Sequence, residues 1–235
     1  MSDVLAIIPA RGGSRGVPGK NLAPVAGRPL IAWTVDAARG AKCIGRTVVT
    51  TDHADIADAA RAEGAEVPFM RPAFLAADDT PGIDPLVHAL LWLAEHEGFR
   101  PQWVVCLQPT SPLRISADID AAFELVRTHG AQAVISVTRS PVHPRWLMRL
   151  DDDGRCEPWH GSPPPQRQAA QPAWALNGAI YLAQTQWLLD NRTWYGEHTF
   201  AMPMPEERSL DVDTPWQMHL ADLCLRQGRE LKVAS

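Results

Sequence analysis

The chain has 235 residues, 46% of them hydrophobic, which is enough to bury the core of one globular domain. Its formal net charge of −5 argues against a protein built to hold DNA or RNA, which usually carries a basic surplus. The four cysteines form no Cys-x-x-Cys pair, and no apolar run is long enough to span a bilayer. We therefore expect a soluble, cytoplasmic protein with a single domain, residues 1–235, whose anionic ligand is small.

The first part of the chain alternates between strand-like and helix-like segments. Short apolar or β-branched runs predict buried strands at 4–9, 46–51, 67–69, 103–107 and 133–137. Apolar residues at helical spacing predict helices at 30–39, 56–63, from Asp84 onward and around 119–126. Strands that alternate with helices predict an α/β fold with a doubly wound, mostly parallel sheet covered on both faces.

Residues 140–175 interrupt this alternation and are rich in Pro, Arg, Gln and Trp. The three prolines at 163–165 exclude a continuous helix. The segment is either a disordered insert or an arm that packs on a partner chain, and its three tryptophans favour packing. Strand-like sequence then returns at 177–183 and 199–202, and a closing helix begins at Thr214.

A basic, glycine-rich loop follows the first strand, in the sequence IIPARGGSRGVPGKN at residues 7–21. Ser14 and Asn21 break the Walker A pattern, and the glycine spacing does not fit the dinucleotide fingerprint. Glycines nevertheless let backbone N–H groups approach a phosphate, and nearby cations balance its charge. The cations are Arg11, Arg15 and Lys20. Because open α/β sheets bind ligands at the carboxyl ends of their strands, we favour a phosphate site over an exposed basic turn.

Two carboxylates near the end of the chain, Asp211 and Asp213, stand two residues apart in the sequence SLDVDT. On an extended segment both face the same side, with their apolar neighbours on the other. Beside a triphosphate this pair suits Mg²⁺, which prefers one or two carboxylates together with phosphate oxygens and water. A capping box from Thr214 to Gln217 is an alternative explanation for Asp213, but it leaves Asp211 unexplained.

Taken in order, these motifs resemble those of the CMP-sialic acid synthetases, or acylneuraminate cytidylyltransferases. After the glycine-rich loop the matching segments are Thr50-Thr51-Asp52, Arg71-Pro72, LQPTSPLR at 107–114, NGAIY at 177–181 and LDVDT at 210–214. The resemblance implies a Rossmann-like, nucleotidyltransferase-type fold that transfers CMP from CTP to the anomeric hydroxyl of a sialic-acid-like nonulosonate and releases pyrophosphate. A CMP-Kdo-type enzyme, another sugar-nucleotide pyrophosphorylase and a catalytically inactive nucleotide-binding relative remain as alternatives.

The same resemblance assigns roles to individual residues. It makes Asp211, Asp213, Arg11 and Lys20 catalytic, with both aspartates as Mg²⁺ ligands. Its nucleotide-binding residues are Arg11, Gly12, Gly13, Ser14, Lys20, Asn21 and Arg71. Its sugar-binding residues are Gln108, Asn177, Arg145 and Arg167, the last two within a 140–175 arm that is expected to form a homodimer. Each also has a structural alternative: a loop-capping amide for Gln108, a turn residue for Asn177, and surface or salt-bridged arginines.

The chain departs from the family pattern at two places. Ala175 stands where relatives often carry an arginine, and Pro81 and Gly82 stand where they often carry small hydroxyl residues. Both places bear on contacts with the sugar or the base. These departures make a nonulosonate other than N-acetylneuraminate more plausible as the substrate.

Overall fold

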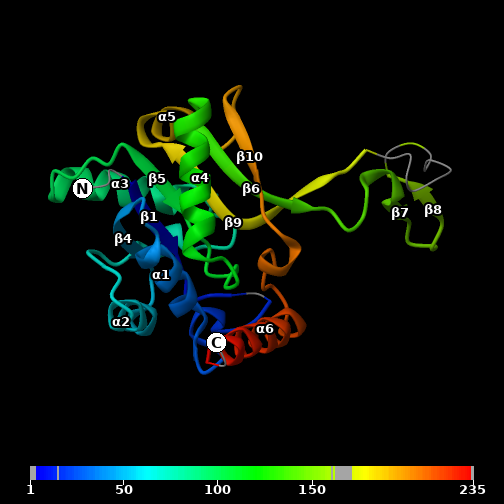
Figure 1. Ribbon diagram of the computed structural model, residues 1–235, viewed down its shortest axis with the longest axis horizontal. Helices are drawn as coiled ribbons and strands as arrows, with labels where there is room; N and C mark the ends of the chain where they lie inside the picture. Colours follow the sequence, from blue (N-terminus) through cyan, green and yellow to red (C-terminus); the bar gives the residue numbers. More distant parts are fainter. Residues whose placement is uncertain (1–3, 15, 160, 162–170, 234–235) are drawn as a thin grey trace.

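A six-stranded sheet forms the centre of the protein, as the computed structural model in Figure 1 shows. The structure describes residues 4–14, 16–159, 161 and 171–233, with side chains as far as residue 228. The strands are β1 (Val4–Pro9), β4 (Ile44–Thr50), β5 (Trp103–Cys106), β6 (Ala133–Arg139), β9 (Trp174–Gln184) and β10 (Thr199–Pro203). They lie in the order β10-β6-β9-β5-β1-β4, and only β9 runs antiparallel to its neighbours. The predicted mostly parallel α/β sheet is confirmed.

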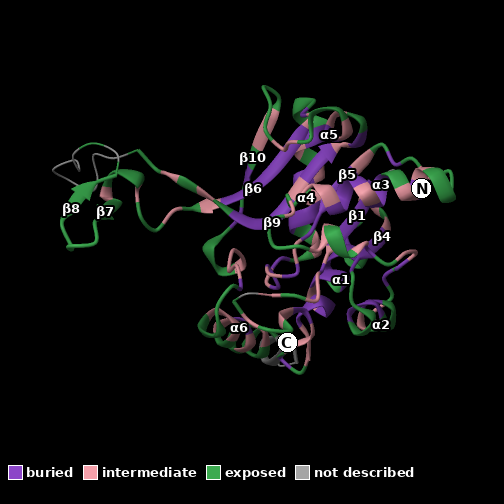
Figure 2. Cartoon of the chain, turned by 180° about the vertical axis from the view of Figure 1, so that it is seen from behind, coloured by how far each residue is buried: buried purple, intermediate pink, exposed green. Residues whose placement is uncertain are grey.

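Helices cover both faces of this sheet. They are α1 (Leu30–Gly40), α2 (Ala54–Ala62), α3 (Asp84–His96), α4 (Ser116–His129) and α5 (Thr185–Asn191). In β1, Val4, Ala6 and Ile8 pack in the core beneath α1, α2 and α4, whereas Leu5 and Ile7 pack beneath α3 and α5. Successive side chains of a strand point to opposite faces, so an unbroken apolar run serves both layers. Figure 2 shows this buried core concentrated in the sheet.

Among the elements beside the central sheet, two differ from the sequence-based expectation. The prediction of a strand at 67–69 is wrong, because this region contributes only an isolated bridge between Glu66 and Val48. Pro68 has no backbone N–H to donate to a sheet, which ends the pairing there. Helix α5 was not predicted, since its seven residues follow β9 directly and are too few to show a helical period.

A third, smaller core joins the two ends of the chain. Helix α6 (Pro215–Val233) packs near the hairpin of β2 (Pro24–Val25) and β3 (Arg28–Pro29). The buried residues Val25, Leu30, Val212 and Ala221 form this core. It holds the segment before α6 beside the start of the chain. Among the described residues, no helix combines the length and apolar character needed to cross a membrane.

The described part of the 140–175 arm leaves the body as a long projection (Figure 1). It contains the turn η3 (Pro144–Trp146) and an antiparallel hairpin of β7 (Met148–Leu150) and β8 (Cys156–Pro158). Prolines 163–165 and Arg167 lie outside the described residues. Large apolar side chains of the arm are exposed, with Leu150 at 70% and Trp174 at 52%. The arm therefore presents apolar surface that the described residues leave exposed.

Candidate active site

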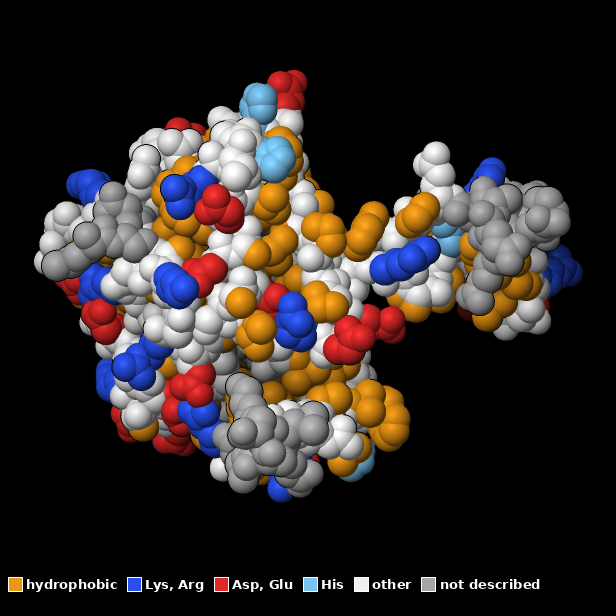
Figure 3. Space-filling view, viewed as in Figure 1, with side chains coloured by type: hydrophobic (Ala, Val, Ile, Leu, Met, Phe, Trp, Pro, Cys, Tyr) orange, Lys and Arg blue, Asp and Glu red, His pale blue; other side chains and the backbone are white. Residues whose placement is uncertain are grey.

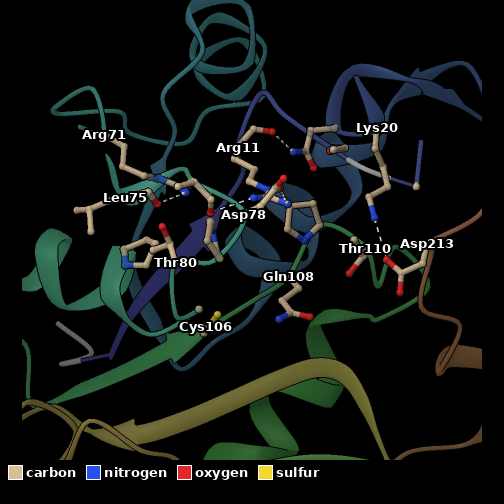
Figure 4. Close-up of a pocket in the computed structure, with 18 of the residues that line it drawn as sticks. Arg11, Lys20, Arg71, Leu75, Asp78, Thr80, Cys106, Gln108, Thr110 and Asp213 are labelled. Atoms are coloured by element: carbon tan, nitrogen blue, oxygen red, sulfur yellow. Dashed lines mark hydrogen bonds and ion pairs between the residues drawn. The ribbon is translucent and has the colours of Figure 1, made fainter. Parts of the chain in front are cut away.

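A cavity of about 500 Å³ opens where β1 and β5 end (Figure 4). Its walls come from the glycine-rich loop, the segment between Arg71 and Pro85, the loop after β5, and the pair Asp211 and Asp213. This is the edge of the sheet at which open α/β proteins bind ligands. The structure thus brings the cationic loop and the acidic pair, from opposite ends of the chain, to one cavity.

The glycine-rich loop is held in shape by two polar side chains. Asn21 is 6% exposed, and its Nδ2 donates to the carbonyl oxygen of Arg11 at 2.9 Å. Asp52, from the Thr-Thr-Asp motif, accepts from the Gly12 N–H at 2.9 Å through Oδ1. The described residues that line the cavity include Ser14 and Asn21 but neither Gly12 nor Gly13. The Gly12 N–H that was expected to approach a phosphate is therefore bonded to a carboxylate here.

Arg11 reaches across the cavity to the loop after Arg71. Its Nη1 donates to the Ala77 carbonyl at 3.1 Å, and its Nη2 lies 2.8 Å from Oδ1 of Asp78 (Figure 4). Asp78 lines the same cavity, although sequence analysis does not select it. Its only signal was its place in the loop that follows the Arg71-Pro72 motif. The carboxylate keeps the guanidinium of Arg11 turned toward the cavity.

Arg71 lies beneath this loop and is 5% exposed. Its guanidinium donates to the carbonyl oxygen of Thr50, to Thr50 Oγ1 at 3.2 Å, and to the Leu75 carbonyl at 3.4 Å. Burial lowers the pKa of Arg71 to about 10, so the side chain stays protonated at neutral pH. Arg71 therefore fixes the loop and also adds positive charge at the cavity wall.

Lys20 connects the two ends of the chain directly. Its Nζ lies 2.7 Å from the carbonyl oxygen of Val212 and 3.0 Å from Oδ1 of Asp213 (Figure 4). Val212 is fully buried in the small core, whereas Asp211 and Asp213 both line the cavity. This alternation matches the expectation that the two carboxylates of an extended segment share one face.

Gly16 allows the loop to lie against the acidic segment. A Cβ atom built on Gly16 would stand 2.0 Å from the carbonyl oxygen of Asp213, far inside van der Waals contact. Any side chain at this position must push the loop and the Asp213 backbone apart. Glycine is therefore required by the close approach of two backbones.

We expect Gly16→Ala to lower turnover by about ten- to a hundred-fold, because misplacing catalytic groups by an ångström can cost this much. Steady-state rates with saturating substrates would measure the effect. Gly228→Ala, in α6, is the control, since a Cβ there meets nothing within 4 Å. Wild-type turnover in the Gly16→Ala variant would show that the loop can move without harm.

Asp211 has the properties of a cation ligand. Its Oδ1 is buried and has no hydrogen-bond partner among the described residues. Burial raises the pKa of Asp211; a hydrogen bond with Thr110 opposes this shift, and the charge of Asp213 adds to it. The described residues contain no group of three or more His, Cys, Asp or Glu side chains suited to a metal. Two carboxylates that leave room for substrate oxygens and water fit Mg²⁺.

The capping box considered as an alternative for Asp213 is also present. Oε1 of Gln217 accepts from the N–H groups of Asp213 and Thr214, both at 2.9 Å, and Gln217 N–H donates to Thr214 Oγ1 at 3.2 Å. These bonds fix the backbone of Asp213 at the start of α6. Its carboxylate still faces the cavity and Lys20, so capping and a functional role are compatible.

Gln108 follows β5 and lines the cavity with its side chain. The backbone carbonyl oxygen of Gln108 accepts hydrogen bonds from Nη1 of Arg114 at 3.3 Å and from Thr34 Oγ1 at 3.4 Å. Arg114 is 2% exposed, donates to the Ala179 carbonyl at 2.7 Å, and has its pKa lowered to about 10 by burial. Arg114 belongs to the LQPTSPLR motif but was not selected from the sequence. It positions Gln108 by holding the backbone of its loop.

Asn177 lies within β9 and is not among the residues that line the cavity, and it is not the turn residue considered as its structural alternative. It is 3% exposed; its Oδ1 accepts from Ser136 Oγ at 2.6 Å and its Nδ2 donates to Ser209 Oγ at 3.0 Å. Ser209 stands two residues before Asp211, so the hydrogen bond from Asn177 helps to fix the backbone of the acidic segment.

The arm carries the two arginines that the sequence predicts to bind the sugar. Arg145 is exposed in η3, on the projection, and Arg167 lies outside the described residues. Arg145 is not among the residues that line the cavity of its own chain.

A second cavity of about 330 Å³ adjoins the first and was not predicted. The two cavities share Gly82, Cys106 and Gln108. The second is otherwise lined mainly by the segments 81–83 and 192–195 and by Tyr181, which include three aromatic rings. Gly82, one of the departures from the family pattern, therefore lies at the junction of the two cavities.

A mostly parallel α/β sheet whose carboxyl edge carries a cationic loop and paired carboxylates defines a nucleotide-handling enzyme of the nucleotidyltransferase class. The family model described as Cytidylyltransferase matches residues 5–143. The chain belongs to the cytidylyltransferase family.

Named relatives cover nearly the whole chain. The CMP-N,N'-diacetyllegionaminic acid synthase of Legionella pneumophila is 34% identical over 232 residues, which are 98% of this chain and 99% of that protein. The N-acylneuraminate cytidylyltransferase of Escherichia coli is 33% identical over 231 residues, 98% of this chain but 54% of that longer protein. The predicted family resemblance is confirmed by these matches.

Solved structures confirm the fold. A CMP:2-keto-3-deoxy-manno-octonic acid synthetase complexed with CTP superposes with a TM-score of 0.69 at 19% identity, over 96% of this chain and 99% of that one. A 4-diphosphocytidyl-2C-methyl-D-erythritol synthase from Anaerococcus prevotii gives 0.66 at 14% identity, over 95% and 96%. At these identities the likeness concerns the fold alone.

Proposed function

We propose that the enzyme transfers CMP from CTP to the anomeric hydroxyl of a sialic-acid-like nonulosonate and releases pyrophosphate. The observation that carries this proposal is the meeting of Arg11 and Lys20 with Asp211 and Asp213 in one cavity. The names of the relatives point to an acidic nine-carbon sugar as the acceptor.

The residues of the cavity are suited to positioning substrates and neutralising charge. The α-phosphorus of CTP is attacked in line by the sugar hydroxyl, and phosphoryl chemistry of this kind depends on alignment and electrostatics. Arg11 and Lys20 hold the triphosphate, with Arg71 adding positive charge beneath the loop. In the free enzyme their partners are Asp78 and Asp213, so phosphate oxygens take over contacts that carboxylates make now.

Asp211 and Asp213 are the residues that would hold Mg²⁺. When bound, the ion offsets negative charge on the α-phosphate and the pyrophosphate. Oδ1 of Asp211, which has no donor among the described residues, supports this assignment, because a buried carboxylate oxygen without a donor is costly unless a cation satisfies it.

We assign the sugar to the second cavity. Gln108 stands where the two cavities meet, and its amide both donates and accepts hydrogen bonds, as a polyhydroxylated sugar requires. The rings of Tyr181, Trp194 and Tyr195 supply an apolar wall for carbon and methyl groups. CTP in one cavity and sugar in the other bring the reacting atoms together beside Gln108.

Pyrophosphate release tests this function. The protein is mixed with CTP, Mg²⁺ and, separately, N-acetylneuraminate, N,N'-diacetyllegionaminate and Kdo, and the nucleotide product is identified by mass. Release with a nine-carbon acid supports the proposal. Release with Kdo alone favours the CMP-Kdo-type alternative, and no release with any sugar favours a binding protein without catalysis.

We further propose that the enzyme is a homodimer assembled through the 140–175 arm. The exposed side chains Leu147, Met148, Leu150, Trp159 and Trp174 give the arm an apolar surface (Figure 3). A dimer would bury this surface and bring Arg145 of the arm to the partner's site.

All four cysteines are free and two are exposed, which suits a reducing compartment such as the cytoplasm.

Sedimentation equilibrium should therefore give about twice the chain mass of 25.8 kDa. Leu150→Asp should shift the protein toward the monomer, because it places a charge in the apolar contact. Leu91→Asp is the control, since Leu91 is 55% exposed on α3 in the body of the protein. A single 25.8 kDa species in the wild type would reject the dimer.

A further inference from the structure

Arg192 has an unusual backbone conformation at the edge of the second cavity. It follows α5 with φ 48° and ψ 40°, in the left-handed region that favours glycine. Among the described residues only Ala26 is another non-glycine with positive φ. A strained residue that persists in a cavity wall is a reason to look for a function there.

The side chain of Arg192 is oriented by a carboxylate from another element. Its Nη2 lies 2.6 Å from Oδ1 of Asp84, the first residue of α3. A guanidinium carries five N–H donors. Among the described residues, Asp84 is the one that accepts a hydrogen bond from the guanidinium of Arg192. The remaining donors are available to a ligand in the cavity that Arg192 lines.

Arg192 lies away from the reacting centre. The two cavities meet at Gly82, Cys106 and Gln108, whereas Arg192 lines only the second. In a nonulosonate the carboxylate is attached to the anomeric carbon, so it stays near the nucleotide. The group that reaches Arg192 must belong to the opposite end of the sugar.

We propose that Arg192 is a specificity-determining residue that reads a hydrogen-bond acceptor on the exocyclic chain of the sugar, away from the anomeric carbon. This inference rests on the proposed function and deepens it. A guanidinium only donates, so it selects an acceptor such as an acyl carbonyl oxygen and disfavours a free ammonium group. Tyr181 and Trp194, whose ring centroids are 5.5 Å apart, offer a wall for the methyl of the same acyl group.

The combination of donor and rings fits an acetamido group on the exocyclic chain. N,N'-diacetyllegionaminate carries such a group there, and N-acetylneuraminate carries a hydroxyl. We therefore expect the wild-type enzyme to prefer the first sugar, by kcat/KM.

Arg192→Gly removes the side chain and is compatible with the left-handed backbone conformation at this position. Glycine adopts the left-handed conformation freely, so the melting temperature should stay the same or rise. We expect the KM for the diacetylated sugar to rise about ten-fold or more, the KM for CTP to stay within about two-fold, and the preference between the sugars to shrink toward one. Arg192→Lys should lose most of the preference, because lysine keeps the charge but not the planar fork. Ala26→Gly relieves the other positive φ and should leave the preference unchanged.

The outcomes separate the two proposals. Turnover by the wild type with an unchanged preference in Arg192→Gly overturns the role of Arg192 and leaves the proposed function standing. Equal rises of KM for CTP and for the sugar also overturn the role of Arg192, since they indicate general damage to the site. No turnover of any nonulosonate by the wild type overturns both proposals.

Discussion

Replacing Asp211 with alanine should lower the rate of CMP transfer by about 1000-fold or more, because preorganised electrostatic groups at developing charge contribute effects of this size. The carboxylate lines the cavity, and its buried Oδ1 has no other partner among the described residues. Circular dichroism should show an intact fold, since the adjacent Val212 keeps the segment in the small core.

The same carboxylate should reduce stability in the absence of metal. Its pKa is raised by burial, so between the usual aspartate pKa and the raised value the folded protein binds more protons than the unfolded one. The free energy of unfolding contributed by Asp211 therefore falls as pH rises through this window. At neutral pH, Asp211→Asn should raise the melting temperature of the metal-free enzyme while removing turnover.

Thermal melts with and without Mg²⁺ and CTP would complete this test. The ligands should stabilise the wild type clearly more than the Asn variant, because only the wild type retains the carboxylate. Asp58→Asn is the control, since Asp58 is an exposed acid on α2. Unchanged turnover in Asp211→Ala would remove this residue from the mechanism.

Replacing Arg11 with alanine should weaken CTP binding by about ten- to a hundred-fold, which corresponds to the loss of one or two charge-assisted hydrogen bonds. Binding of the sugar should change far less, because Arg11 lines the first cavity and is absent from the second. The side chain already faces the cavity through its ion pair with Asp78, so little reorganisation precedes phosphate binding.

Isothermal titration with each substrate would measure this difference. Asp78→Asn serves as the matched variant, because it frees the same guanidinium without removing it, and it should weaken CTP binding much less than Arg11→Ala. Equal losses of CTP and sugar affinity in Arg11→Ala would count against a phosphate role for this residue.

Two contacts at the site that the sequence does not reveal have one cause. Asn177 was expected to contact the sugar, but the register of β9 against β6 turns its amide toward Ser136 and the interior. Gly12 was expected to bind phosphate, but Asp52, two residues beyond the end of β4, accepts a hydrogen bond from its N–H. In one case the partner lies on a neighbouring strand and in the other just beyond the end of one, and the order of strands in a sheet is not written in local sequence.

The sequence by itself determined the features that depend on local geometry. The apolar runs identified the main strands, the Asp211-Val212-Asp213 alternation placed two carboxylates on one face, and the cap of α6 followed from the residue types at Thr214 and Gln217. Backbone periodicity and hydrogen bonds within a few residues control all of these.

Only the tertiary structure decided which of these features meet. Lys20 and Asp213 are 193 residues apart and touch because α6 and the β2–β3 hairpin share a small core. The second cavity exists because β9 lies between β5 and β6 and brings Tyr181 beside the loop after α5. Contacts of this kind depend on the packing of distant apolar surfaces, which many different segments satisfy equally well, so local sequence patterns do not specify them.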